Sequence, residues 1–195
     1  MWMSALLIAT GYLIGSIAAA IVVGHWLHLP DPRSKGSKNP GATNMLRIGG
    51  KVAGALTLLG DMLKGVLPVL LAQGLGASTT VVATTGLATF LGHLYPVFFR
   101  FRGGKGVATS LGVTLGFHWP VGLAAMGTWL LVALVFRISS LAALVTALLI
   151  PFYFWWRYPE PAILLVSAVI TVLLYWRHRG NIRNLIDGTE ARFGA

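Results

Sequence analysis

Residues that could do chemistry gather in three short polar segments between long apolar stretches. The segments read LPDPRSKGSKNPGATNMLRIGGK at 29–51, RFRGGKG at 100–106 and RHRGNIRNLIDGTE at 177–190. They supply cations, hydroxyls, amides and glycines, which are the groups that hold a phosphate or another small anion. The chain has no cysteine and five acidic residues, which excludes thiol catalysis and Cys-ligated metals and argues against two-metal carboxylate chemistry.

The first segment has the composition of an anion-binding turn that leads into a helix. Its prolines and glycines allow tight turns and a close approach of backbone to a ligand. Ser37, Thr43 and Asn44 are residue types that cap helices, so we expect backbone N–H groups to point outward there. A helix start beside Arg47 would bind an anion. The alternative is a capped loop whose lysines hold lipid headgroups.

In the second segment, three glycines surround one lysine. Gly103, Gly104 and Gly106 beside Lys105 suit a nest of N–H groups around a phosphate. The segment is not a P-loop, because glycine rather than Ser or Thr follows the lysine. It opens the short apolar stretch 107–117, and a broken helix at membrane depth is tolerated where it lines a cavity. The alternative interpretation is a basic turn that anchors a helix end.

The third segment carries a histidine and an amide on one predicted helix face. His178 and Asn181 are three residues apart, a spacing that places both side chains on the same side of a helix. An amphipathic tail at a membrane surface usually contacts lipid, and a single histidine there is more often structural. The segment by itself therefore leaves a structural and a functional role open.

Three further polar residues lie outside these segments. Asp61 and Lys64 share a face inside one apolar stretch. An intramembrane charge is a functional candidate, but we favour a packing pair in which each partner satisfies the other. His93, shortly before the second segment, stays open between the two roles.

Composition places the chain in a membrane. Of 195 residues, 56% are hydrophobic and 10% are charged, and the mean hydropathy is +0.77, whereas soluble domains carry about 25% charged residues. The formal net charge is +10. The basic residues stand in short clusters between apolar runs, which favours anionic lipid or a small anionic substrate over nucleic acid as the binding partner. We expect an all-α polytopic membrane helical bundle that forms one domain over 1–195.

Seven apolar stretches set the predicted topology. Six approach the length of about 20 residues that crosses a hydrocarbon core of roughly 30 Å, whereas Val107–Phe117 is too short for a full crossing. If all seven cross and the N-terminus is outside, most of the 15 Lys and Arg residues lie on the cytoplasmic side. We therefore predict seven transmembrane helices, at least one of them short, with a cytoplasmic C-terminus. The six longer stretches are Trp2–Trp26, Val52–Gly74, Thr79–Phe99, Trp119–Phe136, Ser139–Trp156 and Ala162–Trp176.

Taken together, the three segments resemble the acyl-phosphate:glycerol-3-phosphate acyltransferase family (PlsY) of the bacterial inner membrane. The matching stretches are GSKNPGATNMLR at Gly36–Arg47, GHLYPVFFRFRGGKGVAT at Gly92–Thr109 and RHRGNI at Arg177–Ile182, followed by Gly188 and Glu190. The similarity extends over essentially the whole chain. One departure is Asn184, where the family pattern has a basic residue before Leu185.

The resemblance implies an activity and its partners. The family moves a fatty acyl group from acyl phosphate to the 1-hydroxyl of sn-glycerol 3-phosphate, which gives lysophosphatidic acid and inorganic phosphate in the first acylation step of bacterial phospholipid synthesis. It uses no cofactor, no metal and no nucleic acid. It works in membrane lipid, with the active site facing the cytoplasm, and allows a transient contact with the enzyme that makes the acyl phosphate.

The resemblance also assigns roles to individual residues. The catalytic residues would be His178, Asn181, Ser37, Arg47 and Lys105. The substrate-binding residues would be Asn39, Gly41, Thr43, Asn44, Gly103, Gly104, Gly106 and Ser140, with Glu190 as a structural residue.

The chemistry suits this set of residues. An acyl phosphate is already activated, so the protein needs cations and fixed N–H donors rather than a covalent nucleophile. The base is either His178 or the phosphate of the substrate itself. Three other classes compete with this interpretation: an anion channel or phosphate transporter, a CDP-alcohol-type phosphotransferase and a structural lipid-binding protein. The polar segments stop at one face and the five acids are scattered, which argues against the first two.

Overall fold

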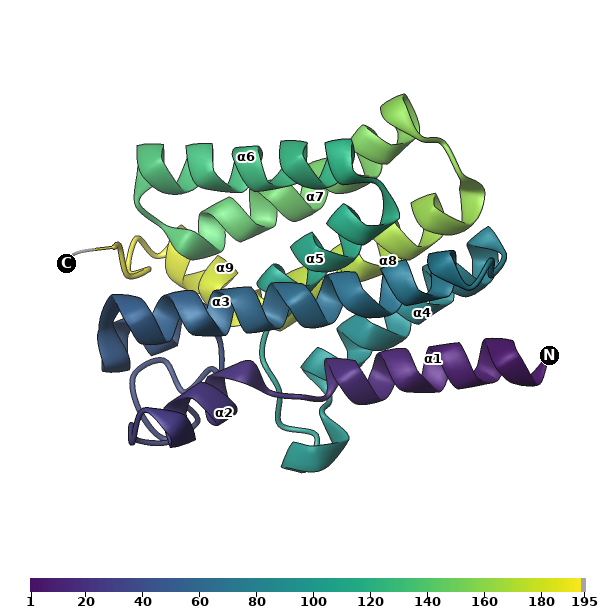
Figure 1. Ribbon diagram of the computed structural model, residues 1–195. Coiled ribbons are helices and arrows are strands. Elements are labelled where there is room, and N and C mark those ends of the chain that lie inside the picture. Colours follow the sequence, from purple (N-terminus) through teal and green to yellow (C-terminus); the bar gives the residue numbers. More distant parts are fainter. Residues whose placement is uncertain (194–195) are drawn as a thin grey trace.

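The computed structural model describes residues 1–193, and every regular element in that range is helical, as the sequence predicts. The helices run back and forth along one direction, and α5 lies between α3 and the α6–α7 pair (Figure 1). The elements are α1 (Trp2–Gly15), α2 (Ala19–Trp26), α3 (Ala42–Gly74), α4 (Thr79–Leu94), the 3-10 turn η1 (Val97–Phe99), α5 (Val107–Phe117), α6 (Trp119–Phe136), α7 (Ser139–Arg157), α8 (Pro161–Arg177) and α9 (Arg179–Ile186).

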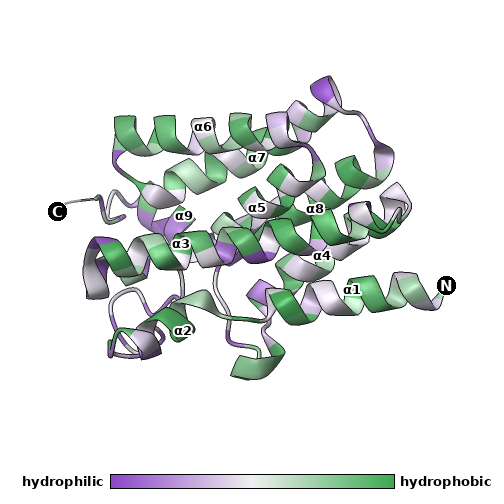
Figure 2. Ribbon diagram, in the orientation of Figure 1, coloured by the Kyte–Doolittle hydropathy of each residue, from purple (hydrophilic) through white to green (hydrophobic). Residues whose placement is uncertain are grey.

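Apolar side chains cover the outside of the bundle. On α6, Leu130, Leu131 and Leu134 are each more than half exposed, and Trp155 and Trp156 at the end of α7 are 69% and 80% exposed. Figure 2 shows hydrophobic residues along the outward sides of α1 and α6, whereas hydrophilic residues gather in the α2–α3 connection and α9. A surface of this kind is suited to lipid rather than water.

Four helical segments of residues 1–193 are long and apolar enough to cross a membrane, or six if each bent pair counts as one span. The four are α3, α4 together with η1, α6 and α7. The pairs are α1 with α2, bent by 43°, and α8 with α9, bent by 61°. The short helix α5 has the bounds expected from the sequence, and the count of seven crossings stays a prediction.

Helix α3 begins before the apolar stretch that starts at Val52. It starts at Ala42, close to the helix start expected beside Arg47, so nearly half of the first polar segment is helical. Met45 is fully buried and packs with Ala20 of α2 and with Ala53, which explains why the chain is already helical here. Gly50, with φ 73° and ψ −169°, then interrupts the helix, a backbone conformation that glycine adopts without strain.

Helix α5 lies inside the bundle, where it packs against α3, α4, α6 and α8. Its 11 residues extend about 16 Å, roughly half of the hydrocarbon thickness. Glycines allow α3 and α5 to touch backbone to backbone. A Cβ on Gly112 would lie 2.2 Å from the Met62 carbonyl oxygen, and one on Gly65 would lie 2.5 Å from the carbonyl oxygen of Thr109. This contact fixes the start of α5 beside α3.

A glycine-to-alanine pair tests this contact. Gly112→Ala should lower the free energy of unfolding by about 1–3 kcal/mol, because a methyl group there forces α3 and α5 apart. The matched change is Gly74→Ala, where an added Cβ would meet no described atom within 4 Å beyond its chain neighbours and the adjacent helix backbone, so it should not destabilise the protein. Thermal unfolding in detergent measures both. Equal melting temperatures for the two variants would contradict a tight α3–α5 contact.

Candidate active site

The three polar segments meet at one cavity of about 640 Å³. The cavity also has an apolar part, formed by residues such as Leu58, Met62 and Leu111, which continues between α3, α5 and α6 toward Trp129 and Leu130. Most of the site residues expected from the sequence line it: Ser37, Asn39, Gly41, Thr43, Asn44, Arg47, Lys105, Gly106, Ser140, His178, Asn181 and Glu190. Gly103 and Gly104 lie behind this lining.

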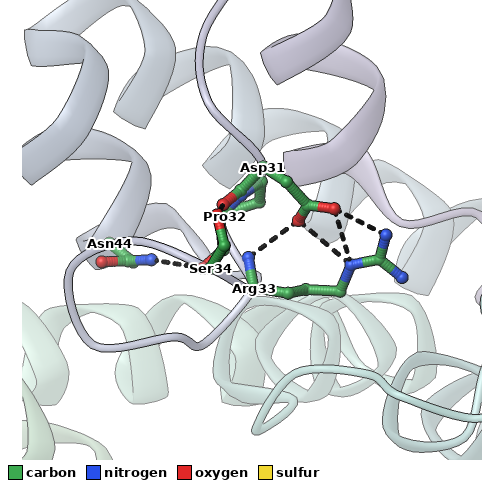
Figure 3. Close-up of polar contacts among 5 residues, drawn as sticks. All are labelled: Asp31, Pro32, Arg33, Ser34 and Asn44. Carbon is green, nitrogen blue, oxygen red and sulfur yellow. Dashed lines mark hydrogen bonds and ion pairs between the residues drawn. The ribbon is translucent and has the colours of Figure 1, made fainter.

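The first segment folds around the side chain of Asn44 (Figure 3). Asn44 is 1% exposed, and its Nδ2 donates hydrogen bonds to the carbonyl oxygens of Pro32 at 2.9 Å and Lys35 at 3.1 Å. Its Oδ1 accepts a 2.9 Å hydrogen bond from the backbone N–H of Ser37. Gly36 has φ +59°, and a Cβ there would lie 2.2 Å from Asn44 Oδ1. The hydrogen bonds of the Asn44 amide therefore hold this loop in place and keep Ser37 at the cavity.

An ion pair closes the outer side of the same loop. Arg33 Nη2 lies 2.6 Å from Asp31 Oδ2 (Figure 3), and its guanidinium lies 6.0 Å from the centre of the Phe99 ring. Hydrogen bonding to Arg33 lowers the pKa of the Asp31 carboxyl and raises the pKa of the arginine. These contacts join the first segment to η1, which precedes the second segment.

Three helices begin at the cavity, but side chains do not cap them as expected. The N-cap of α3 is Gly41, and within residues 1–193 no side chain caps it, so the prediction that Ser37, Thr43 and Asn44 act as caps is wrong. Helix α5 follows Gly106 at φ +90°, and α7 begins at Ser139. First-turn N–H groups have no acceptor within their own helix and carry the positive end of the helix dipole. The three starts therefore favour an anion in the cavity.

The second segment is held from both sides. A Cβ on Gly103 would lie 2.0 Å from the His93 carbonyl oxygen, and one on Gly104 would lie 2.3 Å from His93 Nε2. On the other side, Arg177 Nη2 donates to both glycine carbonyl oxygens at 2.9 Å, and the guanidinium lies 5.8 Å from the centre of the Tyr95 ring. The N–H of Gly104 donates to the His93 carbonyl oxygen, so it is not part of a phosphate nest. Lys105 and Gly106 face the cavity instead.

Glu190 joins the third segment to the start of α7, and Asn181 joins it to the second segment. Glu190 Oε1 accepts hydrogen bonds from Asn181 Nδ2 at 2.6 Å and from Ser140 Oγ at 2.7 Å. The Oδ1 of Asn181 in turn accepts one from Lys105 Nζ. Asn184, the departure from the family pattern, donates to Glu190 Oε2 at 3.2 Å. Burial lowers the pKa of Lys105, and Glu190 offsets part of that effect.

His178 lies in the bend between α8 and α9 and is 3% exposed. Its Nδ1 lies 2.9 Å from the carbonyl oxygen of Leu174, which can only accept, so Nδ1 carries the proton. In the neutral imidazole, the lone pair is therefore on Nε2. His178 and Asn181 both line the cavity, which agrees with the predicted shared face.

Sequence reasoning assigned no role to Lys51 or Arg177, favoured a packing role for Asp61 and left His93 open. Lys51, Asp61 and His93 line the cavity, and Arg177 holds the turn behind it. The only signal for Arg177 was its position directly before His178. Asp61 and Lys64 do pair, at 2.8 Å, as expected.

Comparison with known proteins assigns the chain to a family. A family profile described as glycerol-3-phosphate acyltransferase matches residues 5–188. The chain belongs to the glycerol-3-phosphate acyltransferase family. It is 55% identical over 190 residues to a glycerol-3-phosphate acyltransferase of Methylococcus capsulatus, covering 97% of this chain and 96% of the relative. It is 52% identical over 194 residues to one of Thioalkalivibrio sulfidiphilus, covering 100% of this chain and 96% of the relative.

Solved structures agree with this membership. The acyltransferase is similar to the crystal structure of PlsY (YgiH), an integral membrane glycerol 3-phosphate acyltransferase, in the glycerol 3-phosphate form, with a TM-score of 0.94 and 40% identity over 98% of this chain and 96% of that chain. Against the lysophosphatidic acid form the TM-score is 0.88 at 39% identity, with the same coverage. The protein is a multi-pass integral membrane acyltransferase, which excludes the channel, the CDP-alcohol phosphotransferase and the structural lipid-binding protein.

Two neighbouring arginines test how the turn is held. Arg177→Lys should lower the rate of acyl transfer at least about tenfold, because a lysine cannot hold two carbonyl oxygens in the planar geometry of a guanidinium. Arg179→Lys is the matched control, since Arg179 is exposed and both its side-chain hydrogen bond and its cation–π contact are with Trp176. Equal rates for both variants would show that the turn does not need Arg177.

Proposed function

We propose that the acyltransferase uses acyl phosphate as donor and the 1-hydroxyl of sn-glycerol 3-phosphate as acceptor, and releases lysophosphatidic acid and inorganic phosphate. The observation that carries this proposal is the single cavity where Arg47, Lys105 and His178 meet from three separate segments and which continues into an apolar part. A polar end suits two phosphoryl groups, and an apolar end suits a fatty acyl chain.

Phosphate binding would come from cations and helix starts acting together. Arg47 and Lys105 supply positive charge, and Ser37 supplies a hydroxyl beside the first turn of α3. Asn39, Gly41, Thr43, Gly106 and Ser140 would complete the substrate contacts. Gly103, Gly104 and Asn44 would act indirectly, because the fold uses them to pack the turn and hold the loop. Glu190 would be structural, since it orients Asn181 and Ser140.

The reaction needs one proton transfer and no covalent enzyme intermediate. The 1-hydroxyl oxygen attacks the acyl carbonyl carbon, and a tetrahedral intermediate forms with negative charge on the former carbonyl oxygen. The carbon–oxygen bond to phosphate then breaks, and inorganic phosphate leaves. Lys105 and the helix N–H groups would stabilise these charges. The hydroxyl proton passes to His178 Nε2, or to a phosphate oxygen of the substrate, and ends on the released phosphate.

The topology that we propose puts this cavity on the cytoplasmic side of the bacterial inner membrane. The α2–α3 and α6–α7 connections lie with α9 at one end of the bundle, whereas the N-terminus and the α3–α4, α5–α6 and α7–α8 connections lie at the other (Figure 1). This alternation fits seven crossings with the N-terminus outside, and the basic residues then follow the positive-inside rule. We also propose that the chain forms one domain over 1–195 and that the reaction needs no cofactor or metal. A cytoplasmic opening of the cavity would allow a transient contact with the enzyme that makes acyl phosphate.

The choice of donor is the first test. Purified protein in detergent, supplied with labelled glycerol 3-phosphate, should form lysophosphatidic acid and one equivalent of phosphate from an acyl phosphate. Acyl-CoA of the same chain length should give no product above background, because its acyl carbonyl is bonded to sulfur and carries no phosphate that the cation-lined end could hold and stabilise as the leaving group. Product from acyl-CoA at a comparable rate would overturn the proposed donor.

The base is the second test. His178→Ala should lower kcat by about 10²–10⁴-fold, as expected for loss of a general base. Arg183→Ala, which removes an exposed cation from the same helix, should leave kcat nearly unchanged. Retention of full activity by His178→Ala would leave the substrate phosphate as the only proton acceptor.

A further inference from the structure

Three ionisable residues form a buried cluster that the proposed mechanism does not use. Asp61 is 2% exposed, and Lys64 and His93 are each 6% exposed. Lys64 Nζ lies 2.8 Å and His93 Nδ1 lies 3.5 Å from the same oxygen, Asp61 Oδ1. Burial of such groups inside a membrane protein is costly, so a cluster of this kind calls for a functional explanation.

The cluster connects two places where the helical backbone is interrupted. Lys64 Nζ donates a 2.7 Å hydrogen bond to the carbonyl oxygen of Ile17, in the break between α1 and α2. At the other end of the cluster, the imidazole of His93 packs directly against Gly104, since a Cβ on Gly104 would lie 2.3 Å from His93 Nε2. Gly104 directly precedes Lys105 in the turn. The imidazole therefore stands between the Asp61 carboxylate and the backbone that carries Lys105.

We infer that His93, which lies between Asp61 and Gly104, is a positioning residue that sets where the Lys105 ammonium lies in the cavity. Arg177 donates hydrogen bonds to the carbonyl oxygens of Gly103 and Gly104, and the rigid imidazole ring of His93 packs against Gly104. Both constraints are needed because a glycine-rich turn has no side chains of its own to fix its backbone. A shift of about 1 Å in a charged group is enough to reduce catalysis strongly.

This inference rests on the proposed role of Lys105, so the experiment measures both. An unreactive acyl phosphonate, which mimics acyl phosphate, is titrated into the full-length protein in detergent by calorimetry. The alkyl chain keeps binding measurable when phosphate contacts are lost. Four proteins form a double-mutant cycle: the unchanged chain, His93→Ala, Lys105→Ala and the double variant. His118→Ala is the matched control, because His118 stacks on Tyr158 away from the cavity lining.

Each single change should weaken binding about tenfold, and the double variant should bind no more than about twofold worse than Lys105→Ala alone, because His93 acts through the lysine. If the affinity losses of the two single variants multiply in the double variant, the positioning role of His93 is overturned while Lys105 remains a ligand. Unchanged binding by Lys105→Ala would overturn the role of the lysine and this inference with it. If His93→Ala does not fold, the same cycle with His93→Asn, which keeps a polar group near Asp61 but lacks the ring edge beside Gly104, gives the same decision.

Discussion

The cavity depends on one steric constraint, the backbone contact that fixes the buried helix α5 against α3. Gly65 and Gly112 lie so close to the opposite backbone that neither position has room for a methyl group. Because α5 is half as long as a membrane span, its first turn lies within the bundle rather than at a lipid surface. The basic turn before it is therefore carried to the wall of a cavity. Polar backbone at this depth is stable only where it faces such a space.

Electrostatics give the rest of the site its shape. The chain is strongly basic, and its few acids are used as hubs: Glu190 joins Ser140, Asn181 and Asn184, and Asp61 joins Lys64 and His93. Asp61 pairs with Lys64, and Glu190 offsets part of the effect of burial on the ammonium of Lys105. The cations and helix starts that remain at the cavity favour anionic ligands. The proposed reaction, which brings two phosphorylated molecules together at the edge of a bilayer, needs this balance.

Some of the site was predictable because local spacing carries it. The i, i+3 spacing of His178 and Asn181 and the glycines around Lys105 are local patterns, and the structure brings all three residues to the cavity. The capping roles were wrong because the chain had a competing use for Asn44, which holds the loop 32–37. Gly103 and Gly104 were expected to touch substrate, whereas their missing side chains serve close packing against His93. Residue type alone does not distinguish a glycine that admits a ligand from one that admits a neighbouring side chain.

The sequence by itself determined the membrane class, the helical content, the short α5 and the family, because hydropathy, span length and motifs are properties of contiguous residues. Only the tertiary structure decided how the three polar segments share one cavity and which side chains hold the turn. Arg177 and Gly103 are 74 residues apart, and Lys64 and Ile17 are 47 residues apart. Contacts of that separation depend on how whole helices pack, and no local periodicity records them.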